Sequence, residues 1–323
     1  MKFHKFKPYV KCGLFLILVI SLAGTANAAT NHTGGIALSW DDVLSIDPCY
    51  QYLQMFKDNN VKCTINVNSN DLIYSEQGTK DNLGALHSAG WEVAAHGLNH
   101  EDAILYINNY TSDGWLNQEV IPNINDLTGY GYSPVYTFVY PYGSRDANSD
   151  AALVPYFRTI RSTEFNVVNV NASNAYYKWD NTQVLYAVEI DDNSGVSPES
   201  IKAGIDYAMA NGYVLLLYGH TITPTITGDY QTSTSRLGEI LNYTKEQGGE
   251  FYLLGDLGNS SWSSTTSNVT ANFTVSTDSV KVGESVTFVD YSVNQNSELL
   301  DFGDGSNSTT ANVNHIYTTP GTY

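Results

Sequence analysis

Two pairs of side chains in the first third of the chain have the types and spacing of a metal centre. His96 and His100 lie four residues apart, and Asp41 and Asp42 are adjacent. On one helical turn, two imidazoles with this spacing face the same way and can share a cation. One carboxylate would complete a site of two histidines and one carboxylate, and the other would take a proton from a bound water. The alternatives are capping or surface roles for both pairs.

Two further positions could complete an active site. His220 follows the apolar run 213–218 and would be an acid whose pKa its surroundings can tune. A capping or core-edge histidine is the alternative. The turn Tyr140-Pro141-Tyr142-Gly143 could aim a backbone N–H at a developing oxyanion, although most such sequences are simple turns.

Strands of one parallel sheet would bring these residues together. The expected strands are 36–40, 61–67, 91–95, 135–140, 157–161, 184–190, 213–218 and 251–254, and the expected helices are 49–58, 81–88, 115–127, 198–211 and 235–247. Continuous apolar runs are typical of strands that are covered on both faces. The alternation predicts one α/β domain over residues 34–257, a (β/α) barrel with the candidate residues at its carboxyl end.

Four segments, in one order, resemble the polysaccharide deacetylase family, the NodB-homology domain of carbohydrate esterase family 4. They are Ser39-Trp40-Asp41-Asp42, Gly90-Trp91-Glu92-Val93 leading to His96–His100, Phe138-Val139-Tyr140-Pro141-Tyr142-Gly143, and Leu215-Leu216-Leu217-Tyr218-Gly219-His220. The resemblance covers about residues 34–257. It implies a distorted (β/α) barrel, NodB-like, that removes acetyl groups from N-acetylated or O-acetylated polysaccharides or oligosaccharides.

The resemblance also implies a role for each matching residue. It makes Asp41 the general base, Tyr142 the backbone oxyanion donor and His220 the general acid. The implied metal ligands are Asp42, His96 and His100. A metal-bound water would attack the acetyl carbonyl. Zn²⁺ is the default divalent ion for such ligands, and Co²⁺, Ni²⁺ or Fe²⁺ would fit the same set.

The chain departs from the family's pattern at three places. Ser39-Trp40 replaces Thr-Phe before the aspartates, and Gly97 stands where Ser or Thr commonly follows the first ligand histidine. Val139 stands where the family often has an arginine that orients the base.

Two residues at expected strand ends could orient the base and the acid. We expect Arg161, which ends the strand 157–161, to supply the missing charge beside the base. Asp191 follows the strand 184–190 and could orient His220, the alternative being an ordinary loop carboxylate.

The composition changes at Gly258. Residues 258–268 read as a linker rich in Ser, Thr and Asn, and short alternating strands are expected at 271–275, 280–282, 285–290 and 299–302. Leu300-Asp301-Phe302-Gly303-Asp304-Gly305 and Pro320-Gly321-Thr322-Tyr323 resemble a polycystic-kidney-disease (PKD) domain. The resemblance implies that residues 269–323 are a partial all-β, immunoglobulin-like module, incomplete at its last strand, with Asp301 and Asp304 as turn residues.

Residues 1–28 are expected to be a signal peptide, with four lysines before an apolar core and Ala26-Asn27-Ala28 as cleavage site. An uncleaved anchor is the alternative, although the apolar run is shorter than a membrane span. We therefore expect a secreted or cell-surface, extracytoplasmic protein that could be attached through its C-terminal region.

The formal net charge of −18 argues against nucleic acid as a partner. Cys49 and Cys63 are expected to be buried, unpaired thiols.

Three functions fit these observations. The first is a hydrolase acting on acetylated glycans. The second is an amidase acting on a non-sugar C–N bond, because fold does not fix substrate. The third is a catalytically weak surface protein that keeps the metal site and only binds glycan. The presence of both Asp41 and His220 favours the hydrolase, since binding alone needs neither.

Overall fold

The computed structural model describes residues 32–262, 273–292, 299–310 and 312–323. The expected signal peptide and the expected linker from residue 263 onward lie outside the described residues. Among the helices of the described ranges, none combines the length and the apolar character needed to cross a membrane.

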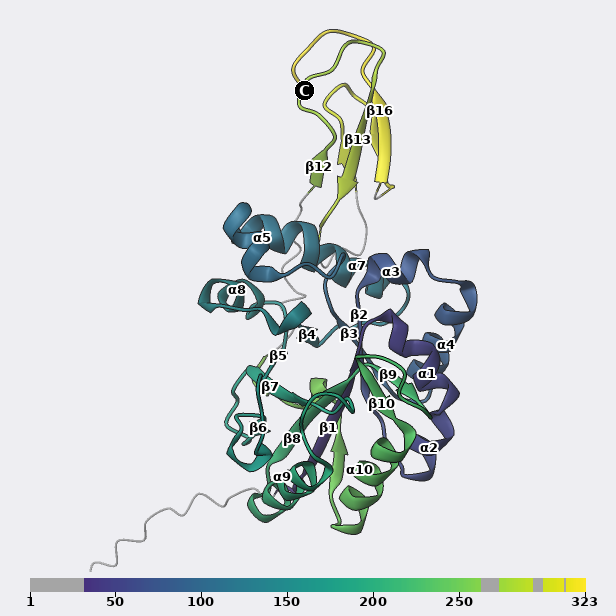
Figure 1. The fold of residues 1–323 in the computed structure, drawn as a ribbon. Coiled ribbons are helices and arrows are strands. Elements are labelled where there is room, and N and C mark those ends of the chain that lie inside the picture. Colours follow the sequence, from purple (N-terminus) through teal and green to yellow (C-terminus); the bar gives the residue numbers. More distant parts are fainter. Residues whose placement is uncertain (1–31, 263–272, 293–298, 311) are drawn as a thin grey trace, which may run out of the picture. The chain divides into compact units, whose positions relative to one another are not determined.

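Seven parallel strands close into a barrel (Figure 1). Around the barrel they are β1 (Gly35–Asp41), β2 (Thr64–Val67), β3 (Glu92–Ala95), β4 (Thr137–Val139), β5 (Thr159–Thr163), β7 (Val184–Glu189) and β8 (Val214–Gly219). Strand β8 closes the ring by pairing with β1. Two short strands extend the sheet, β11 (Glu250–Tyr252) along the start of β1 and the antiparallel β6 (Tyr176–Tyr177) along β8. The predicted (β/α) barrel is therefore confirmed.

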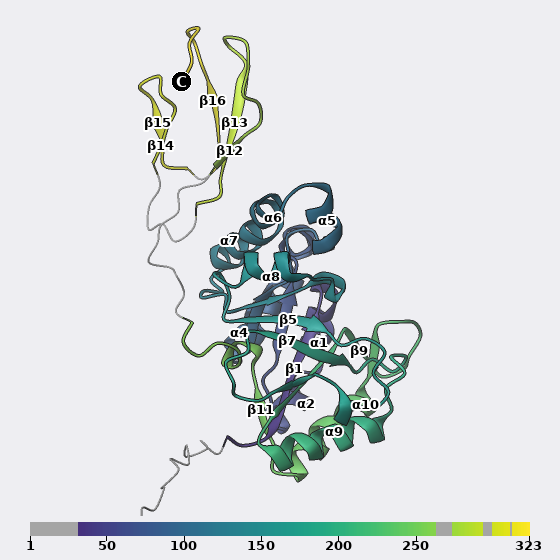
Figure 2. The ribbon, with the colours of Figure 1, turned by 90° about the vertical axis from the view of Figure 1, so that its left-hand side faces the viewer.

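Helices lie outside the barrel (Figures 1 and 2). They are α1 (Ile46–Gln51), α2 (Leu53–Asp58), α3 (Ser69–Tyr74), α4 (Gln77–Ser88), α5 (Ala103–Asn109), α6 (Ser112–Trp115), α7 (Ile121–Gly129), α8 (Ala147–Leu153), α9 (Pro198–Asn211) and α10 (Thr234–Glu246). The bounds predicted for α9 are confirmed. Its start is fixed by the Ser197 hydroxyl, which accepts from the backbone of Ser200, and its end by Gly212 with φ of 65°.

Three predicted helices differ from the structure. The expected helix 49–58 begins at Ile46 and is divided at Tyr52, and the expected helix 81–88 begins at Gln77. The expected helix 115–127 is continuous with α6 and α7 but contains a π-helical turn at Leu116–Val120. The apolar periodicity located these helices, but it did not define their ends or the irregular turn.

Side chains of the barrel strands alternate between two apolar regions, as the period of two requires. In β8, Leu215 and Leu217 belong to the large core that includes Ile201 of α9, whereas Leu216 and Tyr218 belong to the cluster that includes Leu254. The same alternation in β1 places Trp40 in the large core. Asp41 therefore faces away from the helices, on the side of the strand where a barrel has its interior. Cys49 and Cys63 are buried and unpaired, as predicted.

The C-terminal segment contains antiparallel strands. β13 (Ser285–Asp290) pairs with β12 (Phe273–Val275) and β16 (Asn312–Ile316), and β14 (Leu300–Asp301) pairs with β15 (Asn307–Ser308). Among the described residues, the strand expected at 280–282 is absent, because this segment leads into a turn. Asp301 and Asp304 accept backbone N–H groups within the turns, as expected. The resemblance to a PKD domain stays a prediction.

Candidate active site

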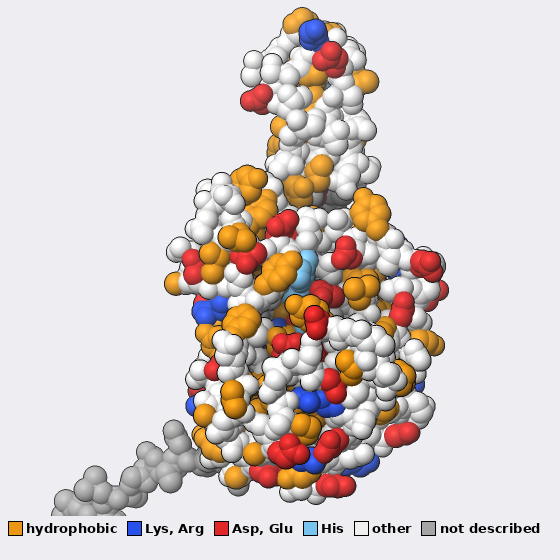
Figure 3. Space-filling model, viewed as in Figure 1, with side chains coloured by type: hydrophobic (Ala, Val, Ile, Leu, Met, Phe, Trp, Pro, Cys, Tyr) orange, Lys and Arg blue, Asp and Glu red, His pale blue; other side chains and the backbone are white. Residues whose placement is uncertain are grey.

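The residues predicted to form the site lie together at the carboxyl ends of the barrel strands. Six of them line one pocket of about 460 Å³: Asp41, Asp42, His96, His100, Tyr142 and His220. In Figure 3, exposed histidine atoms (pale blue) lie beside hydrophobic and acidic side chains. Strands far apart in the sequence therefore place the candidate residues around one cavity, where barrel enzymes have their chemistry.

Asp42, His96 and His100 converge in the way that a single cation needs. The Asp42 Oδ1 atom lies 3.3 Å from His100 Nε2 and 3.6 Å from His96 Nε2. One ligand atom from each of the three residues lies within 4.8 Å of the other two. Two ligands about 2.0–2.2 Å from a tetrahedral ion are separated by about 3.3–3.6 Å, so these atoms could hold Zn²⁺ or a similar ion.

The ring of His96 is fixed by a partner on the neighbouring strand. Its Nδ1 lies 2.8 Å from the carbonyl oxygen of Val139. When Nδ1 carries the hydrogen, Nε2 is free to bind a cation. Burial lowers the pKa of His96, although Asp41 and Asp42 oppose this effect, and so favours the neutral, ligating ring. Val139 thus contributes its backbone to the site.

The segment His96–His100 is a loop, so the helical turn expected there is wrong. Gly97 has φ of 81° and His100 has φ of 60°, both in the left-handed region that an α-helix excludes. The loop is held by Glu119 of the π-helical turn, whose carboxylate accepts the Asn99 backbone N–H at 2.9 Å and side-chain amide at 2.6 Å. A serine or threonine at Gly97 would be strained, which gives a conformational reason for this departure.

Non-glycine residues with left-handed backbones gather at the site. Besides His100, Asp42 has φ of 71° and Tyr142 has φ of 58°. Such conformations require support from surrounding structure and cluster at functional sites. Within the described chain, the side chain of Asp42 makes no capping hydrogen bond to the short helix that follows it. The capping alternative therefore does not account for this carboxylate.

Asp41 is buried between two partners from neighbouring strands. One oxygen, Oδ1, accepts from Asn66 Nδ2 at 2.7 Å and pairs with Nη2 of the fully buried Arg161. Burial alone would raise the pKa of Asp41, but the charges of Arg161, His96 and His220 and the Asn66 hydrogen bond hold the pKa below its usual value. Arg161 thus lies where the sequence predicted a substitute for the missing arginine.

His220 is held by Asp191, also as predicted. The ring Nδ1 lies 2.5 Å from Asp191 Oδ2, while Asp191 Oδ1 accepts from Thr232 Oγ1 at 2.6 Å and from the His220 backbone at 3.2 Å. Burial lowers the pKa of His220, but Asp191, Asp41 and Asp42 outweigh it and raise the pKa to about 9. At neutral pH this ring carries a proton that it could donate.

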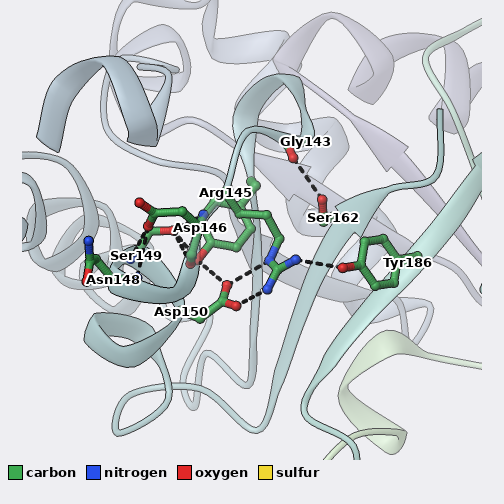
Figure 4. A network of polar contacts seen from close by, with 9 residues as sticks. Gly143, Arg145, Asp146, Asn148, Ser149, Asp150, Ser162 and Tyr186 are labelled. Atoms are coloured by element: carbon green, nitrogen blue, oxygen red, sulfur yellow. Dashed lines mark hydrogen bonds and ion pairs between the residues drawn. The ribbon is translucent and has the colours of Figure 1, made fainter. Parts of the chain in front are cut away.

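Side-chain bonds hold the turn that carries Tyr142 to three neighbouring elements, α8, β7 and β5 (Figure 4). The Arg145 guanidinium pairs with Asp150 of α8 and donates from Nη1 to the Tyr186 hydroxyl of β7 at 2.6 Å. Ser162 Oγ donates to the carbonyl of Gly143 at 2.8 Å. These bonds restrain both sides of the turn whose backbone the sequence predicts as oxyanion donor.

Sequence reasoning missed Glu189, the last residue of β7, which also lines the pocket. Burial and the charge of Asp191 raise its pKa to about 7. The available signal was the period of two along a strand, because residues 189 and 191 lie on the same side.

The pocket is also bordered by exposed apolar side chains. Leu44, Tyr142, Phe165 and Tyr230 line it with 80, 64, 63 and 63% of their surface exposed. Three of these are aromatic and offer flat faces beside the candidate metal ligands.

The comparisons with known proteins cover some of the candidate site residues but not all of them. The family model described as polysaccharide deacetylase matches residues 28–155. The match identifies a polysaccharide deacetylase domain and confirms the predicted enzyme class, a hydrolase of non-peptide C–N bonds. The matched segment includes the candidate metal ligands, Asp41 and Tyr142. His220 and Asp191 lie beyond it. No curated protein matches the chain.

Three solved structures have a distant similarity to this chain. A chitin deacetylase from the fungal pathogen Colletotrichum lindemuthianum is 20% identical, covering 71% of this chain and 90% of its own, with a TM-score of 0.45. The peptidoglycan N-acetylglucosamine deacetylase Bc1960 is 19% identical over 70% and 88%, with a TM-score of 0.47. A CE4-family pseudoenzyme from Bacillus anthracis is 14% identical over 70% and 65%, with a TM-score of 0.49. These likenesses are too distant to assign a substrate.

Proposed function

We propose that this chain, whose residues 28–155 match the polysaccharide deacetylase family model, is a secreted, metal-dependent hydrolase that removes acetyl groups from polysaccharides or oligosaccharides. One observation carries the proposal. The possible ligands Asp42, His96 and His100 share a pocket with a carboxylate paired to arginine and a histidine paired to aspartate. Such a pocket could hold a Lewis acid beside a base and an acid.

The three ligands would hold one divalent ion, most simply Zn²⁺, which when bound supplies an acidified water and a polarised carbonyl. Asp41 would take the proton of the attacking water, because Arg161 and Asn66 keep it in the carboxylate form. His220 would give its proton to the leaving nitrogen or oxygen, with Asp191 holding the ring in place. Each carboxylate thus has a separate task, set by its partner.

The remaining pocket residues would position the glycan. The Tyr142 backbone N–H would stabilise the developing oxyanion, in a turn restrained by Arg145 and Ser162. The exposed rings of Tyr142, Phe165 and Tyr230 would pack against the apolar faces of sugar rings. Export through residues 1–28 and surface attachment through the PKD-like segment would bring this pocket to extracellular glycans.

Acetate release tests the proposal directly. The purified chain, supplied with Zn²⁺, should release acetate from an N-acetylated chito-oligosaccharide or from acetylated xylan, and a chelator should stop the release reversibly. Binding of these glycans without acetate release would instead support the alternative of a catalytically weak binding protein.

The roles of the two adjacent aspartates are tested by a matched pair of variants. Asp41→Asn should retain stoichiometric zinc and lose turnover, whereas Asp42→Asn should lose zinc. Metal analysis of both purified variants measures this difference. Zinc loss from Asp41→Asn with retention by Asp42→Asn would contradict the assignment.

A further inference from the structure

Glu189 occupies a place in the pocket for which the proposed reaction has no use. It ends β7, two residues before Asp191, and lines the same cavity as the candidate metal ligands. A carboxylate oxygen of Glu189, an oxygen of Asp191 and a ring nitrogen of His220 lie within 4.8 Å of one another. Glu189 is therefore next to the proposed acid and open to whatever occupies the pocket.

The neighbouring acidic groups already have partners. Asp191 bonds to His220 and Thr232, and Asp41 pairs with Arg161. Glu189 lies beside the Asp191 carboxylate and the His220 ring, but in the described part of the chain it forms no ion pair with a lysine or arginine. A half-buried carboxylate that faces a second carboxylate and has no lysine or arginine partner retains lone pairs that favour a donor from a bound molecule.

The reaction itself determines which substrate atom lies here. The atom that leaves the acetyl carbon must be close to His220, because His220 protonates it. In an acetamide this atom is a nitrogen that carries a hydrogen, and Glu189 could accept a hydrogen bond from that N–H. In an acetyl ester it is an oxygen without a hydrogen, whose lone pairs would face the Glu189 carboxylate.

We propose that Glu189 is a substrate-selecting residue, which accepts a hydrogen bond from the acetamide N–H and so favours N-acetyl over O-acetyl glycans. This inference rests on the proposed deacetylase function and narrows its substrate class. A site that bonds a substrate N–H discriminates strongly against an analogue without it, because its own polar group is then left unpaired.

The charge state of Glu189 sets the conditions of the test. Burial and the Asp191 charge raise the pKa of Glu189 to about 7, whereas His220 opposes this effect. At pH 8.5 the carboxylate form predominates, while His220, with a pKa of about 9, still carries its proton in most molecules. Assays at this pH therefore compare substrates with the acceptor in place.

The experiment compares kcat/KM for two matched oligosaccharides, one with 2-acetamido groups and one with 2-O-acetyl groups, using the zinc-loaded full chain. Glu189→Gln should lower the amide-to-ester ratio of kcat/KM about 10- to 100-fold, since it replaces a charged acceptor and adds a donor that an ester can accept. Glu189→Ala removes the acceptor and should lower the ratio in the same direction. Glu164→Gln is the matched control, because this glutamate follows β5, does not line the pocket and bonds to Asn174.

The outcomes separate this inference from the function on which it rests. Acetate release from neither substrate by the unchanged chain would overturn the proposed function. Acetate release with the same ratio in the unchanged chain, Glu189→Gln and Glu189→Ala would overturn only the role of Glu189. A reduced ratio in both Glu189 variants, with the Glu164→Gln ratio unchanged, would support it.

Discussion

The barrel has a largely buried carboxylate near each end, Glu92 at the amino ends of the strands and Asp41 at their carboxyl ends. Neutral donors surround Glu92: the hydroxyls of Thr64 and Thr137, each at 2.7 Å, and the Gly255 N–H at 2.8 Å. Asp41 instead faces a buried arginine. In the described chain, Nε and Nη1 of Arg161 have no hydrogen-bond partner.

This difference separates a structural end of the barrel from the end that we propose to be reactive. The Glu92 carboxylate accepts hydrogen bonds from two strand hydroxyls and one loop N–H, so all of these polar groups have partners. The bonds also connect β2, β4 and the segment after β11. At Asp41 spare donors and left-handed residues remain, an arrangement that stability alone does not favour. Local satisfaction of polar groups is therefore a guide to which end of a barrel performs chemistry.

The two carboxylates should also respond to pH in opposite directions. Burial raises the pKa of Glu92 above its unfolded value, so its contribution to stability is present below the unfolded pKa and is lost as pH rises through the folded pKa. Arg161 and the other partners lower the pKa of Asp41 despite its burial. Its contribution is therefore present above the unfolded pKa and is lost as pH falls through the folded pKa.

Removing Arg161 should have the largest effect. In Arg161→Met, Asp41 is buried without its cation, so its pKa should rise and the acidic limb of the kcat/KM profile should move to higher pH. We expect a loss of about 3–5 kcal/mol in the free energy of unfolding and at least about 100-fold in kcat/KM at neutral pH. Denaturant unfolding and the pH–rate profile measure the two effects.

Arg158→Met is the matched control for this substitution. Arg158 lies just before the same strand but donates to the Asp256 backbone carbonyl and not to a carboxylate. The proposed role of Arg161 would be wrong if Arg161→Met kept both the rate and the acidic limb of the unchanged enzyme.

Removing Glu92 should affect stability without affecting chemistry. Glu92→Ala leaves two hydroxyls and one N–H with no acceptor, which should reduce the free energy of unfolding by about 2–4 kcal/mol. The rate per folded molecule should stay the same, because the site lies at the other end of the strands. Denaturant unfolding, with activity measured on the folded fraction, tests both statements. A tenfold fall in activity of the folded protein would contradict the separation of the two ends.

Replacing Asp191 should shift the alkaline limb of the pH profile. Asp191→Asn removes a hydrogen-bonded negative charge, so the pKa of His220 should fall from about 9 and the proton needed for the leaving group should be lost at lower pH. At pH 8 we expect a loss of about 10- to 100-fold in kcat/KM. Asp192→Asn is the control, since that carboxylate accepts from Ser233 and not from His220. An unchanged alkaline limb in Asp191→Asn would contradict the proposed pairing.

The sequence predicted those parts of the fold and site that depend on short patterns. Apolar runs such as Val214–Leu217 marked the strands, and the polar residues directly after them marked the pocket, because parallel strands end at one edge. Arg161 was named because of its charge at the expected end of the strand 157–161, although β5 (Thr159–Thr163) continues for two residues beyond it.

Features that depend on distant partners could not be predicted. The loop from His96 to His100 is bent by contacts with Glu119 in a π-helical turn, which apolar periodicity does not reveal. Glu189 has no local motif, and its importance depends on His220, which lies on another strand. Most residues of the candidate site were thus predictable, but Glu189 and the backbone conformations were not.

The smallest expected effect concerns the turn that carries Tyr142, at the proposed reactive end of the barrel. Tyr186→Phe removes the acceptor of Arg145 but keeps the ring beneath the guanidinium, 5.6 Å from its centre. Losing one hydrogen bond to a charged group should reduce kcat a few-fold, equivalent to about 1 kcal/mol, with little change in KM or in zinc content.

The control, Tyr243→Phe, removes the hydroxyl that donates to Asp206 on the surface. If the turn holds an oxyanion donor, only Tyr186→Phe should lower kcat, because a donor displaced by a fraction of an ångström weakens the transition state more than the bound substrate. Equal losses of stability and unchanged kcat in both variants would mean that the Arg145 network only supports the fold.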